Sequence, residues 1–225
     1  MRREQLLDRL RSTPRWDVLV IGGGPAGSTV APMLADKGHR VVMLEKAHHP
    51  RFHIGESLLP ANLPLFERMG IAEEVKAIGM LKPGAEFVSP NHDMSSVFCF
   101  AEAWDKSMPY AYQVRRDQFD TVLIRNAAKK GVEVHEGCKA KSVEFLPDNT
   151  VLVRAVHDDG SESEWHARFL VDASGRDTFL ANRFQIKHRN PKHNSSAIYG
   201  HFTGARRNPR SEEHTSELQS PMFIS

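Results

Sequence analysis

A short apolar run at residues 18–21 is the first strong pattern in the chain, and three glycines end it sharply. Such a run is typical of a parallel strand that is buried on both faces. Pro25 fits the first turn of a helix that the apolar spacing predicts over residues 26–37, and Gly38 is the expected terminating residue. A second apolar strand over residues 40–46 ends beside an acid. The pattern therefore predicts a strand, a glycine turn, a helix and a strand.

The rest of the chain alternates between helical and strand patterns. Helical spacing returns at residues 63–69 and 116–130, and a glycine closes each segment. Between these helices, KPGAEFVS, SSVFCFAE and YAYQVRR are typical of strands and predict a further, inserted sheet. Strands are also expected over residues 140–145, 151–157 and 163–171, because the turn signals PDN and DDG separate them. The last of these strands runs into LVDASGR.

Three glycines after the first strand have the spacing of a dinucleotide-binding fingerprint. Gly22 permits a tight turn, Gly24 lets the backbone approach a diphosphate, and Gly27 allows close packing of helix on strand. Glu45 follows Gly24 by about 20 residues, where an acid accepts hydrogen bonds from ribose hydroxyls and repels a 2′-phosphate. The alternatives are an ordinary glycine-rich turn and a site that binds NAD alone.

Composition narrows the class of protein. The chain has 225 residues and 40% hydrophobic residues, enough for an ordinary core, and no window approaches the roughly 18 apolar residues of a membrane span. The charged start lacks the apolar middle of a signal peptide, so we expect a cytoplasmic protein. Cys99 and Cys138 show no CxxC spacing and the histidines no HExxH motif, so we expect reduced thiols and no metal.

Residues 178–210 contain basic residues but no Asp or Glu. These basic residues are scattered among apolar ones and form no recognisable nucleic-acid module, so a solvated face explains them better than a nucleic-acid surface. We expect no nucleic-acid partner.

Several motifs carry a family resemblance. VIGGGPAG, LEK, PRFHIGESLLP, YQVRRDQFD and VDASGRDTFLANRF resemble FAD-dependent oxidoreductases with the hydroxylase-type flavoprotein fold, and more narrowly the flavin-dependent halogenase group. The resemblance covers residues 16–207. It implies an α/β fold, in which a Rossmann-like FAD/NAD(P)-binding domain contains an inserted antiparallel β-sheet substrate domain.

The resemblance also implies which residues line FAD. The GES loop passes beside the flavin in relatives, and Ser57 is additionally expected to cap the next helix, although the loop could be a plain helix N-terminus. The implied cofactor-binding residues are Gly22, Gly24, Pro25, Ala26, Gly27, Glu45, Lys46, Gly55, Glu56, Ser57, Arg115, Asp172, Ala173 and Gly175.

Lys82 matches the lysine that halogenases of this type use to capture or position hypohalous acid. An amine is nucleophilic when neutral and a hydrogen-bond donor when protonated. Burial or a nearby cation must lower its pKa from about 10.4 if it is to attack. A solvent-facing lysine at a strand start is the alternative. Nearby aromatic residues could wall a substrate pocket, but for most we expect a place in the core of the inserted sheet: Phe87, Phe98, Phe100, Trp104, Tyr110 and Tyr112.

The expected organisation has three parts. Residues 1–15 form an N-terminal extension, and residues 16–208 form the FAD-binding domain, with substrate-domain segments at about 80–115 and 190–208. Residues 209–225 are expected to be a non-native tail, because residues 210–220 resemble the translation of a sequencing-library adapter. The Gly-Asp flavin segment and the tryptophan motif of halogenases do not occur, so we expect an incomplete fold.

The resemblance implies an enzyme that uses a flavin hydroperoxide to halogenate or hydroxylate a small organic substrate. A separate flavin reductase is the possible electron-supplying partner. Two alternatives stay open: a geranylgeranyl-type FAD-dependent reductase, and a non-catalytic, truncated FAD-binding fragment.

Overall fold

The computed structural model describes residues 15–89, 91, 94–188, 190, 192, 196–198, 201–202, 218–219 and 222–224. The described residues up to Leu180 form one compact unit, and those from Ala181 onward form a second. No helix in these described ranges is long and apolar enough to cross a membrane.

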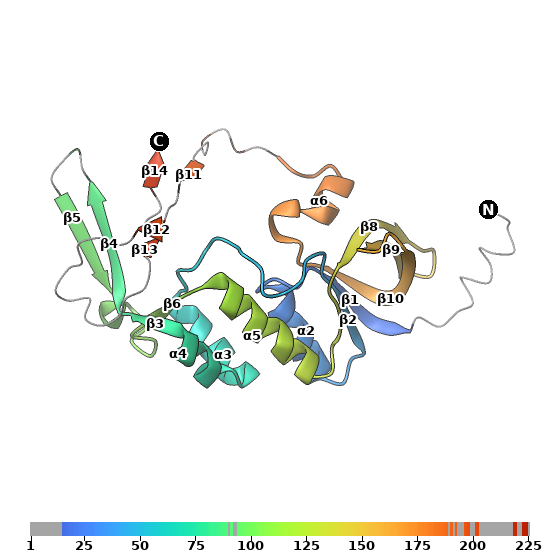
Figure 1. Ribbon diagram of the computed structural model, residues 1–225, viewed down its shortest axis with the longest axis horizontal. Coiled ribbons are helices and arrows are strands. Elements are labelled where there is room, and N and C mark those ends of the chain that lie inside the picture. The colour runs from blue at the N-terminus through green and yellow to red at the C-terminus, as the bar shows by residue number, and fades with distance from the viewer. Residues whose placement is uncertain are drawn as a thin grey trace, which may run out of the picture. The chain divides into compact units, whose positions relative to one another are not determined.

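The first unit is built around a six-stranded sheet with the strand order β7-β2-β1-β10-β9-β8 (Figure 1). The central strand β1 pairs in parallel with β2 and β10, and β7 continues the parallel part on the far side of β2. Strands β10, β9 and β8 form an antiparallel meander. The strands of the sheet are β1 Trp16–Ile21, β2 Val41–Leu44, β7 Glu133–His135, β8 Cys138–Phe145, β9 Val151–His157 and β10 Glu162–Asp172.

Helices connect these strands. Helix α2 follows β1, and helix α5 leads into β7; the two helices lie side by side along the sheet (Figure 1). The shorter helices and helical turns are found in the loops. Their bounds are α2 Gly27–Ala35, η1 Pro60–Asn62, α3 Leu63–Met69, α4 Ala72–Ile78, η2 Phe100–Glu102, α5 Arg116–Lys129, η3 Gly175–Asp177 and α6 Phe179–Arg183.

The expected strand, glycine turn, helix and strand are confirmed as β1, α2 and β2, with the two strands in parallel. Strand β1 is also buried on both faces. Leu19 and Ile21 pack into a cluster with the meander, whereas Val18 and Val20 pack into a cluster with α2 and α5. A third cluster joins α3, α4 and the strand β6 to α5. Helix α5 therefore contributes to two clusters and connects the inserted segment to the sheet.

The inserted segment differs from the single sheet that the sequence predicts. It contains two separate two-stranded sheets, one of β3 Gly79–Lys82 with β6 Ala111–Val114 and one of β4 Gly84–Ser89 with β5 Met94–Cys99. The core position expected for most of its aromatic residues is also wrong. Tyr112 is buried, but Phe87, Phe98 and Trp104 are exposed. Phe87 and Phe98 lie on the two-stranded sheet of β4 and β5, where their rings pack edge to face against each other, and Trp104 lies outside any strand, after η2.

The second unit holds two small antiparallel sheets. Strands β11 Ser196–Ile198 and β14 Met222–Ile224 form one, and β12 His201–Phe202 and β13 Leu218–Gln219 form the other. The sequence pattern did not predict the two strands in the tail. The rest of residues 209–225, together with residues 1–14 and most of 190–208, lies outside the described residues.

The edges of the six-stranded sheet are short or irregular. Strand β7 has three residues, and β8 carries a register shift between Ala140 and Ser142. Lys139 and Lys141 are exposed on this outer strand. Such features are typical of protected sheet edges.

Burial predicts a large stability contribution from Leu19, which is 0% exposed in the centre of β1. We expect Leu19→Ala to lower the free energy of unfolding by about 2 to 5 kcal/mol, because it leaves a cavity in the cluster that β1 forms with the meander. Leu65→Ala is the matched control, since Leu65 is 38% exposed on α3. Urea unfolding followed by circular dichroism measures both. Equal losses for the two variants would contradict the assigned core.

Candidate functional site

Three strand ends meet at one edge of the sheet. In the parallel register, Ile21 lies beside Leu44 on β2 and beside Asp172 on β10. The glycine turn follows Ile21, Glu45 follows Leu44, and Asp172 is itself the first residue of the DASG loop. The carboxyl edge of a parallel sheet, where neighbouring connections leave in different directions, is the usual place for a nucleotide. The structure therefore brings together sequence motifs that are far apart along the chain.

The surroundings of the three fingerprint glycines explain in different ways why each position holds a glycine. Gly22 has φ +102°, and a Cβ atom there would lie 2.4 Å from the carbonyl oxygen of Ala173. A Cβ atom on Gly27 would lie 1.9 Å from the carbonyl oxygen of Gly22, so the close contact of turn and helix requires glycine. Gly24 is different: apart from its chain neighbours, the only atom of the described residues within 4 Å of a Cβ atom there would be the Arg51 Nη2 atom, at 3.6 Å. The protein itself leaves this side of Gly24 open.

Pro25 and Ala26 occupy the turn between these glycines and α2. The regular helix begins at Gly27 with Ala26 as its N-cap. The Ser28 amide already donates to the Gly24 carbonyl at 2.9 Å, so Pro25 lies in this first hydrogen-bonded turn, as expected. The first backbone N–H groups of a helix have no partner within the helix and attract anions. The open side of Gly24 is next to this helix end.

Glu45 is buried and bonded to the backbone. One carboxylate oxygen accepts a hydrogen bond from the Gly23 amide at 2.6 Å, and the other accepts one from the Ala47 amide at 2.9 Å. A Cβ atom on Gly23 would lie 3.0 Å from the Glu45 Cβ atom, so Gly23 has a packing role that its sequence position did not reveal. Glu45 thus ties the end of β2 to the glycine turn.

Lys46 points to solvent and forms an ion pair with Asp177 of η3. The hydrogen bond from Lys46 lowers the pKa of Asp177. This pair connects the segments that follow β2 and β10, on either side of β1. Because both side chains are about half exposed, the pair contributes little to stability.

The DASG loop is organised by its own aspartate. The Asp172 carboxylate accepts hydrogen bonds from the Ser174 amide at 3.0 Å and from the Leu180 amide at 2.7 Å. The Ala173 amide donates to the Ile21 carbonyl at 2.9 Å, which extends the pairing with β1. Gly175 has φ +62°, a conformation that favours glycine. The loop is therefore held next to the glycine turn.

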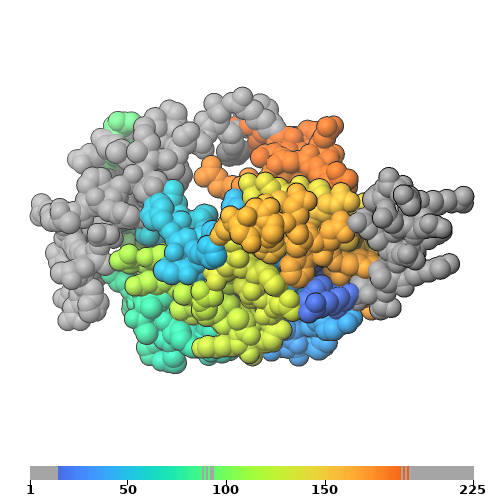
Figure 2. All heavy atoms as spheres, turned by 45° about the vertical axis from the view of Figure 1, so that its right-hand side comes forward, coloured from blue at the N-terminus to red at the C-terminus, as the bar shows by residue number. Residues whose placement is uncertain are grey.

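The loop after β2 is attached to α5 by a buried arginine that the sequence analysis missed. Arg116 forms a two-pronged ion pair with Asp120, at 2.7 and 2.9 Å, and donates to the Ile54 carbonyl at 2.7 Å. Figure 2 shows the loop, in cyan, at the surface beside the yellow-green α5. Arg115, which the resemblance pointed to, is exposed and bonds to Asp117 at 3.0 Å.

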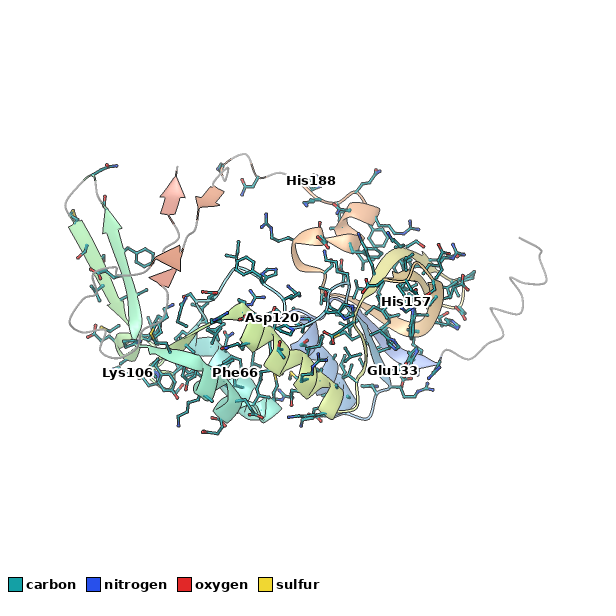
Figure 3. The ribbon with its side chains drawn as sticks, viewed as in Figure 1. Phe66, Lys106, Asp120, Glu133, His157 and His188 are labelled. Atoms are coloured by element: carbon teal, nitrogen blue, oxygen red, sulfur yellow. The ribbon has the colours of Figure 1, made fainter. Side chains whose placement is uncertain are left out.

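A second arginine, Arg51, belongs to the loop after β2 itself and lies between two carboxylates. Its Nε atom is 4.0 Å from Glu45, and its Nη2 atom is 3.7 Å from Asp120 (Figure 3 labels Asp120). The Nε atom is buried and has no hydrogen-bond partner. The i,i+4 spacing of Arg116 and Asp120 on α5 was a local signal that the sequence analysis did not use. Arg51 had no such signal, because it meets Asp120 only through the fold of the loop after β2.

The GES loop pairs with the inserted segment. Gly55 has φ +97°, and its carbonyl accepts a hydrogen bond from Arg116 at 3.3 Å. The Glu56 carbonyl accepts a hydrogen bond from the Val114 amide at 3.0 Å, and Ser57 forms a β-bridge with Gln113. The expected helix cap at Ser57 is wrong: Asn62 is the N-cap of α3, five residues farther on. Pairing with β6 holds Ser57 in extended backbone instead.

Lys82 lies next to this loop. It is the last residue of β3, and its ammonium group donates hydrogen bonds to the Ser57 hydroxyl and, at 3.5 Å, to the Leu58 carbonyl. The Lys82 Nζ atom is also 5.4 Å from the centre of the Phe100 ring. Burial lowers the pKa of Lys82. The structure thus brings together two residues that the sequence analysis selected separately.

Together these features fit a dinucleotide. The edge of the sheet offers a helix N-terminus, an unfilled space at Gly24, a partly buried arginine whose Nε atom has no acceptor, and an acid at the end of β2. Within the described part of the chain, no other group of residues combines these features.

Comparisons with known proteins agree with this interpretation. The family described as FAD binding domain matches residues 15–216. The flavin-dependent halogenase armH3 of Armillaria mellea is 39% identical over 85% of this chain and 38% of its own length. The tryptophan 2-halogenase of Chondromyces crocatus is 35% identical over 84% of this chain and 36% of its own length.

A solved structure, that of the myxobacterial chondrochloren halogenase CndH, is also similar. It superposes with a TM-score of 0.76 and 38% identity, over 87% of this chain and 45% of the CndH chain. The chain thus spans less than half the length of the relatives that it matches.

The surroundings of Gly27 and Gly24 predict that a methyl group destabilises the fold at Gly27 but not at Gly24. We expect Gly27→Ala to unfold the protein or cost several kcal/mol, since its Cβ atom would overlap the Gly22 carbonyl. Gly24→Ala places the same methyl group in open space, so we expect it to change the free energy of unfolding by no more than about 1 kcal/mol. Urea unfolding of the two variants measures the difference. A large loss for Gly24→Ala would contradict the open side of this residue.

Proposed function

Since this chain belongs to the FAD binding domain family and its cofactor is FAD, we propose that the whole protein is a flavin-dependent halogenase acting on a small organic molecule. FAD supplies the oxidation chemistry when bound, and the residues of the chain hold it, exclude water and position the reacting groups. The relatives reported above support this reaction class.

The glycine turn binds the diphosphate of FAD in this proposal. Gly22, Gly24 and Gly27, with Pro25 and Ala26 between them, direct the amides of the α2 N-terminus toward it. The open side of Gly24 supports this role. Glu45 and Lys46, which follow β2, form the adenosine side of the site.

The flavin side is formed by the GES loop and by the loop after β10. Gly55, Glu56 and Ser57 border the flavin, with Asp172, Ala173 and Gly175 lining the cofactor from the strand β10. Arg115, an exposed residue at the N-terminus of α5, also contributes to the FAD site in this proposal through its cationic side chain. The common edge of the sheet supports the assignment of Asp172, Ala173 and Gly175.

One contact carries the halogenase proposal: Lys82 reaches the GES loop through Ser57. A lysine on the inserted segment is thereby placed beside the loop that borders the flavin. Its lowered pKa increases the neutral, nucleophilic fraction of the amine near neutral pH. Lys82 is the catalytic residue of this proposal.

Other functions have weaker support. A geranylgeranyl-type reductase and a non-catalytic FAD-binding fragment explain the glycine turn but give Lys82 no role. A separate flavin reductase that supplies reduced FAD is part of the proposal as a partner.

The halogenase activity is tested on the whole protein. With FAD, a flavin reductase and chloride or bromide, we expect halogenation of a member of a panel of small aromatic compounds that includes tryptophan. Lys82→Ala should bind FAD with unchanged affinity but form no halogenated product by mass spectrometry. Lys106→Ala, which changes an exposed lysine of the same segment, is the control. Undiminished product from Lys82→Ala would refute the catalytic assignment.

The pKa of Lys82 is testable without any turnover. Reductive methylation with ¹³C-formaldehyde labels the lysines, and NMR follows each dimethylamine through a pH titration. Because burial disfavours the charged form, we expect the pKa of Lys82 to lie below the ordinary range of lysine side chains. Comparison with Lys82→Arg assigns the signal. A pKa of Lys82 within or above that range would show that burial does not control this amine.

A further inference from the structure

The GES loop adds a third strand to the two-stranded sheet of β3 and β6. Two backbone hydrogen bonds, of 2.9 and 3.0 Å, join residues 56–58 to β6. They flank the antiparallel β-bridge between Ser57 and Gln113. On its other side, β6 pairs with β3, also in antiparallel register. Strand β6 is therefore the middle strand of a three-stranded ribbon.

The two faces of this ribbon differ in their chemistry. Successive side chains of a strand point to opposite faces of the sheet. One face carries Leu58 and Tyr112, which are buried in the cluster with α3, α4 and α5. The register places Ser57, Gln113 and Lys82 on the opposite face. This polar face contains both groups whose contact carries the proposed function.

Gln113 lies in the middle of the polar face. Its cross-strand neighbours are Ser57 on one side and Met80 on the other. Ser57 and Gln113 form the kind of antiparallel pair in which the side chains approach most closely. The Lys82 side chain crosses β6 past the small Ala111, its partner in the register, and reaches the Ser57 hydroxyl. The Lys82 amine therefore ends next to the cross-strand neighbour of Gln113.

The side chain of Gln113 is not used by the fold. It is partly buried, and its amide group forms no hydrogen bond with any other described residue. Ser57 and Lys82, by contrast, bond to each other. A glutamine amide offers two donors and one carbonyl acceptor, and shielding them from water without a partner is unfavourable. The polar face thus presents one amide that is available to a bound molecule.

We propose that Gln113 is a specificity-determining residue of the halogenase, whose side-chain carbonyl accepts a hydrogen bond from an O–H or N–H group of the substrate. The inference rests on the function proposed above and adds the residue that selects the substrate. An O–H or N–H group on an aromatic ring raises the electron density of the adjacent carbon atoms, which electrophilic halogenation favours. Few polar groups orient a ligand in a typical pocket, so one amide beside Lys82 has a large effect on which carbon atom reacts.

Matched substrate pairs test this contact on the whole protein loaded with FAD. Phenol with anisole, and tryptophan with 1-methyltryptophan, differ by a methyl group that replaces the donated hydrogen. Gln113→Met keeps the length of the side chain but removes the amide. We expect it to lower kcat/KM for the compound with the donor about 2- to 10-fold, the worth of one neutral hydrogen bond, and to leave kcat/KM for its methylated partner unchanged. A merely structural role of Gln113 would lower both values equally.

Substrate binding without turnover gives a second measurement. In the absence of a flavin reductase, calorimetric titration of the FAD-loaded protein with phenol or tryptophan should show the same 2- to 10-fold weakening for Gln113→Met. Gln118→Met is the matched control, because Gln118 is exposed on α5, and it should retain the affinity and the preference of the unchanged protein. We expect Gln113→Met to bind FAD as tightly as the unchanged protein. A loss of FAD affinity as large as the loss of kcat/KM would assign Gln113 to the cofactor and overturn the inference.

The two possible failures are distinct. If the unchanged protein halogenates phenol or tryptophan and Gln113→Met keeps the full preference over the methylated partner, only this inference is wrong. If the unchanged protein halogenates none of the aromatic compounds offered, the proposed function itself is wrong, and this inference with it.

Discussion

The parallel pairing of β1 with both β2 and β10 is the constraint on which the site depends. Each of these strands ends at the same level, so three loops that lie far apart in the sequence leave the sheet side by side. Burial fixes this register, because a shift of one residue would turn Leu19 and Ile21 to the opposite face and separate them from their cluster. The hydrophobic core therefore determines which polar groups can meet at the edge.

A buried ion pair, together with backbone pairing and the packing of Leu58, sets the position of the loop after β2. The Arg116–Asp120 pair is almost completely buried and bonds to loop carbonyls, which satisfies donors that would otherwise be unfavourable in the interior. Removing one partner of such a pair leaves an uncompensated charge, which typically costs more stability than the pair contributes. The loop is thus held in one place by groups that tolerate little substitution.

Local patterns predicted the glycine turn and the acid that follows β2. The spacing of Gly22, Gly24, Gly27 and Glu45 was readable from the sequence because each role depends on a turn, a helix start or a strand end. Arg51 and Asp120 were not predicted, since only the folded loop places them together. The cap expected at Ser57 was wrong because long-range pairing with Gln113 competes with local capping. Likewise, the aromatic residues of β4 and β5 looked like core residues in the sequence, but the two-stranded hairpin leaves Phe87 and Phe98 exposed.

The outer strands of the six-stranded sheet have a consequence for the behaviour of concentrated protein. Pairing of a strand from a second molecule with β8 is hindered by the register shift at Ala140 and by the charged side chains of Lys139 and Lys141. On the other margin, β7 offers only three residues for main-chain pairing. Growth into fibrils by edge-to-edge addition is therefore disfavoured on both sides of this sheet.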